Sequence, residues 1–278
     1  MPSTKPIQRS SVPKGIRVSI FRKTAPLRIE IAGIFFVAAM ENQAKGSHSY
    51  ERFIRKFSIF ERLRRRVFAA QEKVSKMRQG RRKVWHESRR LENLETDLLH
   101  RLRDLELSFE PVVQSFASAY ILLVASAEAF INEIADVELK GRSEEEFDKL
   151  SVIGKWLFLP RLLGFRKKFK LDRDPLQGFA EVVRRRNKLI HHKAQALPLE
   201  DFDPAQVLKD LGLTPQHVER GVNCVRSLVR EFSLTWKGAY GPDWLYPNKN
   251  TFRRPCFFIG DRKASLVLAS NKIDGARL

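Results

Sequence analysis

The sequence predicts an all-α protein, a helical bundle that follows a long helical segment and precedes an irregular tail. Three observations favour this fold class. Apolar residues recur every seven positions between residues 50 and 107, residues 111–139 are apolar nearly all round a helix, and 179–192 and 215–236 repeat apolar residues at helical spacing. With 43% hydrophobic residues in 278, the chain can bury a core.

Four segments are expected along the chain. They are a basic, disordered segment at 1–49, a long basic helical segment at 50–108, the bundle at 109–238 and an irregular tail at 239–278. The apolar run Ile29 to Met40 is interrupted by Glu30 and is shorter than the roughly 20 residues of a membrane span, so no span is expected. A signal peptide, or a working protein that starts at Met40 and not at Met1, are alternatives for this region.

The segment at 50–108 carries a heptad repeat that is complete in one apolar frame and incomplete in the other. The apolar frame consists of Leu63, Ala70, Met77, Val84, Leu91, Leu98 and Leu105, all seven apart. The partner frame is apolar at Phe60, Val67, Val74 and Leu102 but polar at Arg81, Ser88 and Glu95. This pattern predicts a coiled coil or a helical hairpin, with Gly80 as the position of a turn.

Residues that favour helix starts mark the later helices. Pro111 is expected to open the long apolar helix, because proline suits a first helical turn. Ser143 with Glu146 predicts a capping box, and Thr214–Pro215 predicts the start of the last helix. In the tail, CFFIG and SLVLAS are interpreted as short strands or as loose packing on the bundle.

The charge is strongly basic and uneven. Lys and Arg number 52 against 32 Asp and Glu, a formal net charge of +20. Residues 1–107 hold 25 of these bases against 11 acids, whereas residues 108–278 hold 27 against 21. Basic side chains expected on the outer face of the heptad segment are Arg62, Arg64, Arg65, Arg66, Arg78, Arg81, Arg82, Lys83, Arg89 and Arg90. Such a surface favours a polyanion partner, most simply RNA, and the alternative is a solvated basic face.

Cysteine and histidine spacing limits the chemistry. Cys224 and Cys256 form no C-x-x-C pair, which is typical of a reducing compartment and suggests a cytoplasmic location. No zinc-ligand spacing and no glycine-rich phosphate loop occurs, so neither a metal nor another cofactor is expected.

In residues 179–192, FAEVVRRRNKLIHH, polar residues interrupt the helical pattern of apolar residues. At about 100° per residue, Arg186 follows the row of Val182 and Ile190, and Asn187 and His191 follow the row of Val183. Polar side chains on or beside a buried stripe are costly unless they are paired. A functional site is one reason for such a breach, and a structural polar pair is the other.

These residues resemble the R-N-x-x-x-H form of the motif that marks HEPN domains. Arg186-Asn187-Lys188-Leu189-Ile190-His191 supplies the motif, and the apolar helix Phe116 to Ile134 resembles the first core helix of that family. The resemblance covers roughly residues 110–237. It implies a small helical bundle, often a homodimer, that acts as a metal-independent endoribonuclease in stress response, toxin–antitoxin systems or defence, with an antitoxin or another protein as a possible partner.

The resemblance also implies roles for named residues. Arg186, Asn187 and His191 would be catalytic, because an imidazole titrates near pH 7 and a guanidinium binds phosphate. Supporting roles fall to Glu128, which could pair with Arg186, and to His192 and Arg185. Arg166, Lys167, Lys168 and Lys170 in the preceding basic loop are candidate phosphate-binding residues. The alternatives are a non-catalytic HEPN module that binds nucleic acid or a partner protein through residues 50–107, and a coiled-coil scaffold with an incidental basic face.

Overall fold

The computed structural model describes residues 27–80, 84–165, 169–191, 203–237, 242–245 and 257–259. The chain forms two compact units, one of residues 31–254 and a smaller one of residues 1–30 and 255–278. In the smaller unit, β1 (Leu27–Ile29) pairs antiparallel with β2 (Phe257–Ile259). This confirms a short strand within CFFIG, while SLVLAS lies outside the described residues.

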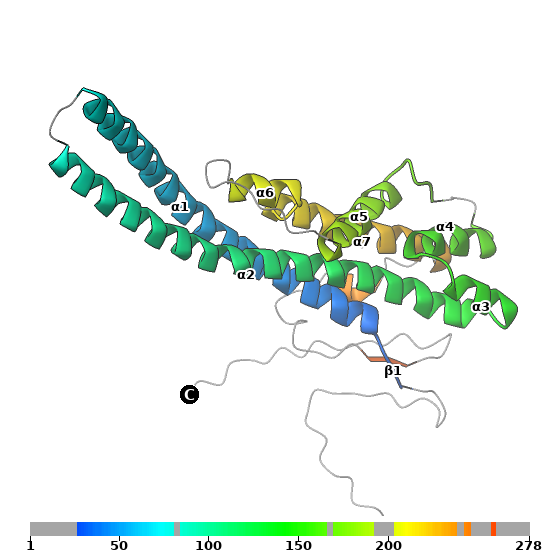
Figure 1. The fold of residues 1–278 in the computed structure, drawn as a ribbon. Coiled ribbons are helices and arrows are strands. Elements are labelled where there is room, and N and C mark those ends of the chain that lie inside the picture. The colour runs from blue at the N-terminus through cyan, green and yellow to red at the C-terminus, as the bar shows by residue number, and fades with distance from the viewer. Residues whose placement is uncertain are drawn as a thin grey trace, which may run out of the picture. The chain divides into compact units, whose positions relative to one another are not determined.

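The larger unit is all-α, as predicted. Its helices are α1 (Ile31–Gln79), α2 (Trp85–Glu138), α3 (Arg142–Asp148), α4 (Val152–Leu162), α5 (Leu176–Ile190), α6 (Pro204–Asp210) and α7 (Pro215–Lys237), followed by the short 3-10 helix η1 (Asp243–Leu245). The helices α1 and α2 lie side by side as a long antiparallel hairpin, and the shorter helices pack on one end of it (Figure 1).

The hairpin confirms the predicted turn. Helix α1 ends at Gln79, and the Gly80 N–H donates to the Lys76 carbonyl at 3.1 Å before α2 begins at Trp85. Polar pairs cross between the two helices, with Lys73 Nζ 2.8 Å from a Glu87 carboxylate oxygen. The expected disorder over residues 1–49 is wrong for residues 31–49, which form the first part of α1.

A seven-residue repeat runs the length of the seam. In α1 the buried positions include Ala32, Ala39, Gly46, Phe53, Phe60, Val67 and Val74, and in α2 they include Leu98, Leu105, Val112, Ala119 and Ser126. Small residues hold the base of the hairpin, where a Cβ on Gly46 would lie 2.5 Å from the Phe116 ring. Farther along, Phe60 and Val67 fill the seam, so the repeat changes from close backbone approach to large side chains.

Two predicted helix starts are wrong. Helix α2 continues through Pro111, so the expected boundary between residues 108 and 109 falls inside one helix. The proline is tolerated because it lies on an exposed face, where water can satisfy the carbonyl of Leu107, itself 64% exposed. At α3 the N-cap is Gly141 with φ 62°, and no side chain caps the helix, so Ser143 forms no capping box.

The core of the bundle surrounds the second half of α2. Trp156 of α4 is fully buried, with its ring centroid 6.0 Å from that of Phe130, 6.2 Å from Phe179 and 5.6 Å from Phe232. These rings come from α2, α5 and α7, so one aromatic cluster fixes the relative positions of four helices. Helix α7 begins at Pro215, and Thr214 Oγ1 accepts from the His217 N–H at 3.4 Å, which confirms the predicted start.

One described helix, α2, is long and apolar enough to cross a membrane by length and composition, and 44% of its apolar window is buried inside the protein. A core helix passes the same test, and the apolar part of α2 contributes Phe116, Leu123 and Ile131 to the core. The absence of a membrane span therefore stays a prediction.

Candidate functional site

Helix α5 presents the motif near its C-terminal end. Leu176, Phe179 and Val182 are buried against the bundle, and α5 contacts α2, α4 and α7. No buried residue follows Val182 in the helix. The His191 N–H donates to the Asn187 carbonyl at 3.0 Å and closes the last turn. The first two turns of α5 are thus anchored, and its last two are more open to solvent.

The motif residues lie on this open part. Arg186 is half-buried, and Asn187 and His191 are exposed, while His192 lies outside the described residues. The expectation that Asn187 and His191 continue a buried stripe is wrong, because the buried face ends one turn earlier. No hydrogen bond or ion pair joins the side chains of Arg186, Asn187 or His191 to another residue that the structure describes.

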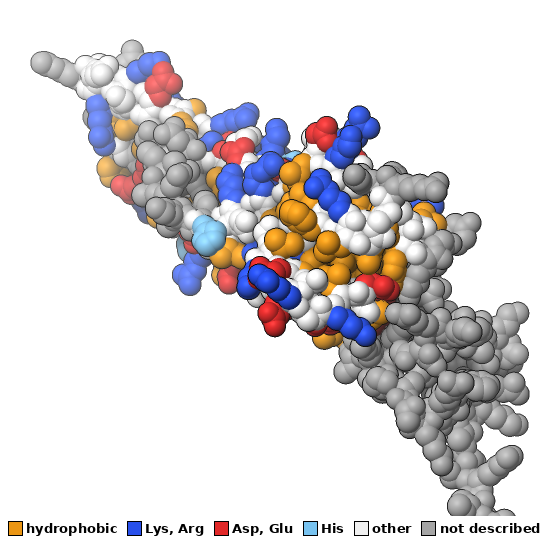
Figure 2. Space-filling model, turned by 90° about the vertical axis from the view of Figure 1, so that its right-hand side faces the viewer, with side chains coloured by type: hydrophobic (Ala, Val, Ile, Leu, Met, Phe, Trp, Pro, Cys, Tyr) orange, Lys and Arg blue, Asp and Glu red, His pale blue; other side chains and the backbone are white. Residues whose placement is uncertain are grey.

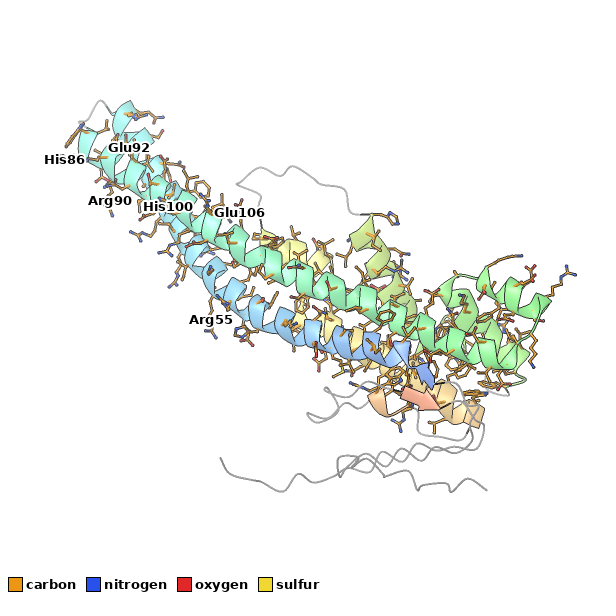
Figure 3. The ribbon with its side chains drawn as sticks, turned by 90° about the horizontal axis from the view of Figure 1, so that it is seen from below. Arg55, His86, Arg90, Glu92, His100 and Glu106 are labelled. Atoms are coloured by element: carbon orange, nitrogen blue, oxygen red, sulfur yellow. The ribbon has the colours of Figure 1, made fainter. Side chains whose placement is uncertain are left out.

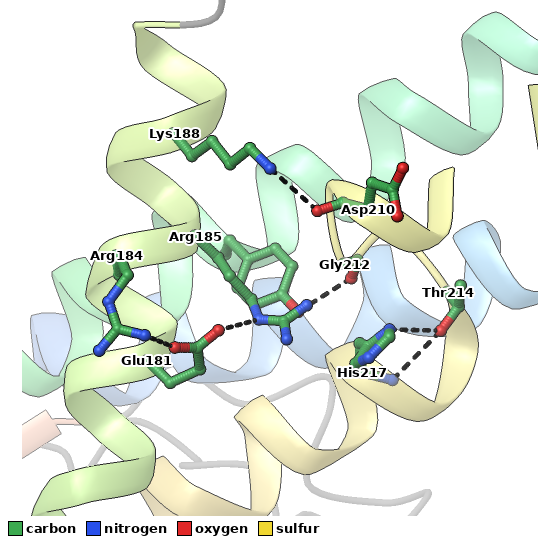
Figure 4. Close-up of polar contacts among 9 residues, drawn as sticks. Glu181, Arg184, Arg185, Lys188, Asp210, Gly212, Thr214 and His217 are labelled. Carbon is green, nitrogen blue, oxygen red and sulfur yellow. Dashed lines mark hydrogen bonds and ion pairs between the residues drawn. The ribbon is translucent and has the colours of Figure 1, made fainter. Parts of the chain in front are cut away.

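Arg185, predicted only as a supporting residue, is the arginine that points into the protein (Figure 4). Its Nε donates to Glu181 Oε1 at 2.9 Å, and the same carboxylate also pairs with Arg184. The Arg185 side chain is 23% exposed and lies beside the hydroxyl of Tyr120. That hydroxyl donates in turn to the carbonyl of Gly212 at 3.0 Å. Arg185 therefore links α5 to α2 and to the turn between α6 and α7.

Burial of Tyr120 raises the pKa of its phenol to about 12, although the nearby Arg185 guanidinium opposes this shift. The phenol is thus neutral at physiological pH and serves as a hydrogen-bond donor, not as an anion.

Gly212 makes this arrangement possible. It ends α6 with φ 72°, a left-handed conformation that favours glycine. A Cβ at this position would lie 1.6 Å from an Arg185 guanidinium nitrogen. The turn therefore requires glycine for its backbone conformation and also for the close approach of Arg185.

Glu128 does not have the predicted partner. Its carboxylate lies 3.5 Å from Nζ of Lys155, a residue of α4 that is only 5% exposed. The Lys155 ammonium also lies 5.6 Å from the centroid of the Phe147 ring. The pairing of Glu128 with Arg186 is therefore replaced by a pair that ties α2 to α4. The reason is that a buried ammonium needs a carboxylate more than a half-exposed guanidinium does.

The predicted phosphate-binding loop is only partly described. Arg166, Lys167 and Lys168 lie outside the described residues, and Lys170 is exposed. On the hairpin, Arg62, Arg65, Arg66, Arg78, Arg89 and Arg90 are exposed as expected. Arg64 is not, since its side chain is 17% exposed and pairs with Glu61 at 2.9 Å, and Arg81, Arg82 and Lys83 lie outside the described residues. Figure 3 shows Arg55 and Arg90 directed away from the hairpin.

A polar pocket that the sequence analysis did not identify lies between α1, α6 and α7. It has a volume of about 380 Å³ and is lined by Tyr50, Asp203, Ala205, Gln206, Lys209, Thr214, Gln216, His217 and Arg220. His217 Nδ1 lies 2.9 Å from Thr214 Oγ1. Burial lowers the pKa of His217, and the cations Arg185, Arg220 and Lys209 lower it further. The spacing Thr214-x-x-His217 at a helix start was the only sequence signal for this site.

The last turn of α5 lies against this region. Nζ of Lys188, inside the motif, donates to the Asp210 carbonyl at 3.1 Å, next to Lys209 of the pocket (Figure 4). Among the described residues, no cluster of three or more His, Cys, Asp or Glu side chains could hold a metal ion. Comparison of the chain with models of protein families, with curated proteins and with solved structures finds no match.

Proposed function

We propose that this protein is a HEPN-type endoribonuclease that cleaves RNA without a metal ion, by attack of the RNA 2′-hydroxyl on the adjacent phosphate. One observation carries the proposal. Asn187 and His191 are exposed one turn apart, and the described part of the chain gives them and Arg186 no polar partner. The alternative of a buried polar pair that holds the bundle fits Arg185 instead, which pairs with Glu181 and lies beside Tyr120.

The chemistry needs few groups. The nucleophile belongs to the substrate, so the protein has to move a proton and to stabilise negative charge on the phosphorus. His191 is the proton-transfer residue in this proposal, and Arg186 is the phosphate ligand, because a guanidinium keeps its charge and offers a planar pair of donors. Asn187 binds the substrate or orients His191. The products are a 2′,3′-cyclic phosphate and a 5′-hydroxyl.

A homodimer is part of the proposal, since resemblance to HEPN domains implies two motifs in one cleft. Exposed apolar side chains of the bundle include Ile121, Phe158, Leu162 and Ile190. Figure 2 shows apolar side chains gathered on one face with both basic and acidic side chains around them, an arrangement that suits association with a second copy. A cytoplasmic setting in stress response, toxin–antitoxin systems or defence, and an antitoxin or other protein partner, are proposals from the resemblance alone.

The test is cleavage of a labelled tRNA pool in EDTA by the wild type, His191→Ala and Arg186→Ala. Loss of a proton-transfer residue is expected to slow cleavage by about 10²–10⁴-fold. Arg230→Ala is the matched control, because it removes an exposed arginine from α7, outside the motif. Intact cleavage in His191→Ala would refute the assignment of the motif. RNA that the wild type binds but leaves whole, with EDTA or with Mg²⁺, would refute the nuclease.

A second candidate is a non-catalytic module that binds nucleic acid or a protein through the hairpin. The exposed arginines of α1 and α2 favour it, because they give the hairpin a basic surface far from the motif in sequence. Salt-dependent RNA binding that is unchanged in His191→Ala, with no cleavage by the wild type, would select this function. Binding that is absent at low salt would exclude both candidates.

A further inference from the structure

The pocket between α1, α6 and α7 is lined by two cationic side chains that pair with no acidic residue in the described part of the chain. Lys209 and Arg220 both line it and both are exposed, and no ion pair joins either side chain to an acidic residue in the described part of the chain. The one carboxylate of the lining, Asp203, is already engaged, since Oδ1 accepts the N–H groups of Ala205 and Gln206 at 3.0 Å each.

Three cationic side chains act on the same imidazole, that of His217. Arg185, Arg220 and Lys209 all lower the pKa of His217, so each of them lies close enough to make a proton on that imidazole less favourable. Glu181 acts in the opposite direction, but it is shared between Arg184 and Arg185. The lining therefore carries two cations, Lys209 and Arg220, against the one carboxylate of Asp203, a balance that favours an anion.

The pocket also includes an aromatic ring. Tyr50 of α1 lines it, is half-buried, and lies against the rings of Phe53 and Phe116, each with a centroid 6.4 Å away. A ring held in this way can stack on a nucleobase while nearby cations bind the phosphate. This combination fits a nucleotide unit better than it fits an inorganic anion.

We propose that this pocket binds one nucleotide unit of a single-stranded RNA, with its phosphodiester between Lys209 and Arg220 and its base on Tyr50. The inference deepens the proposed function and rests on it for the identity of the strand. The Lys188–Asp210 contact places the end of α6, which carries Lys209 of the pocket, beside the last turn of α5, which carries the motif. The pocket residues are binding residues and take no part in the proton transfer.

The test uses the full-length protein with His191→Ala, in EDTA, and a fluorescently labelled single-stranded oligoribonucleotide. Adding Lys209→Gln and Arg220→Gln is expected to weaken binding about tenfold or more, as expected for lost charge-assisted contacts. It should also reduce the slope of log K against log salt by about 1.4, because two phosphate contacts contribute roughly 0.7 each on a single strand. The control, Lys140→Gln with Arg230→Gln, removes the same charge at exposed positions outside the pocket and should leave the slope nearly unchanged.

A site-specific measurement separates this idea from general electrostatics. The His217 ring signals in an NMR spectrum should move when the oligoribonucleotide is added, and not in the Lys209/Arg220 variant. Equal affinity and equal slope in the pocket and control variants would overturn the inference. Adenosine monophosphate that binds as tightly as the oligonucleotide and displaces it would overturn the RNA assignment in favour of a free nucleotide. Cleavage is assayed separately with wild-type His191, so an inactive enzyme refutes the nuclease, and unchanged binding in the pocket variant refutes this site alone.

Discussion

Replacing Gly212 by alanine tests the role of Arg185 most directly. Gly212 and Gly164 end their helices in the same way. In each case the glycine N–H bonds the carbonyl three residues earlier, and the next N–H bonds the carbonyl five residues earlier. Both glycines have φ 72°. They differ in their surroundings, since a Cβ on Gly164 meets nothing within 4 Å, whereas one on Gly212 meets the Arg185 guanidinium at 1.6 Å.

The expected magnitudes follow from this difference. A left-handed alanine costs about 1–2 kcal/mol, and Gly164→Ala should lower the free energy of unfolding by that amount alone. Gly212→Ala has the same backbone cost and also displaces Arg185 from Glu181. A hydrogen bond to a charged group contributes about 1.5–3 kcal/mol, and the 39% exposure of Glu181 favours the low end. Gly212→Ala should therefore cost about 3 kcal/mol.

A double-mutant cycle isolates the contact. In an Arg185→Ala background the clash is absent, so Gly212→Ala should cost only the backbone term of about 1–2 kcal/mol. The assay is urea unfolding followed by far-UV circular dichroism, with the four combinations of the two substitutions measured side by side and Gly164→Ala as the backbone control. A coupling energy below about 0.5 kcal/mol would refute the claim that Arg185 packs on Gly212.

Three further predictions follow from the same structure. Phe60→Ala should destabilise the protein by about 3–5 kcal/mol because the ring is fully buried in the hairpin seam, whereas Phe68→Ala, at a 42% exposed ring, should cost less than about 1 kcal/mol in the same denaturation assay. Tyr120 has its pKa raised to about 12 from 10.0, so its stabilising contribution is complete below pH 10 and is lost as the pH rises to 12. The urea midpoint of Tyr120→Phe should therefore fall less between pH 10 and pH 12 than the midpoint of the wild type does. Lys155→Met should be nearly neutral, while Glu128→Gln, which leaves the ammonium of Lys155 without its carboxylate, should cost about 1 kcal/mol, and a larger loss in Lys155→Met would contradict this reading of the pair.

The hairpin turn and the start of α7 could be predicted because they depend on local signals. Gly80 and Thr214–Pro215 act through backbone chemistry that a single sequence displays. The start of α1 could not be predicted in this way, because its seam positions Ala32 and Ala39 are small. Gly46 fits the same seven-residue frame only because Phe116 fills the space opposite. The partner helix thus decides whether these small residues lie in a seam, and their seven-residue spacing alone does not.

At the candidate site, too, the sequence alone could not decide which of two neighbouring residues points inward. A helical row drawn from Val182 can continue through residue 185 or through residue 186, since spacings of three and four both stay on one face. The helical pattern predicts Arg186 inward, whereas the bundle places Arg185 inward, where Glu181 pairs with it and Tyr120 and Gly212 lie beside it as neighbouring partners. Two of those partners lie more than 25 residues away, so no local pattern could decide between the two arginines.

The run Arg184-Arg185-Arg186 is therefore not a uniform basic patch. Glu181 holds the first two, and the third has no such partner among the described residues, so stability and activity should separate within three consecutive positions. Arg185→Lys keeps the charge but cannot reproduce the Nε–H donation to Glu181, so its effect should be seen in the free energy of unfolding. Arg186→Lys should leave the free energy of unfolding unchanged and alter only the binding of a phosphate. Its effect should therefore be seen in cleavage or in RNA affinity. If Arg186→Lys and Arg185→Lys destabilised the protein equally, the two arginines would share one structural role, and the argument that α5 exposes its motif for a substrate would fail.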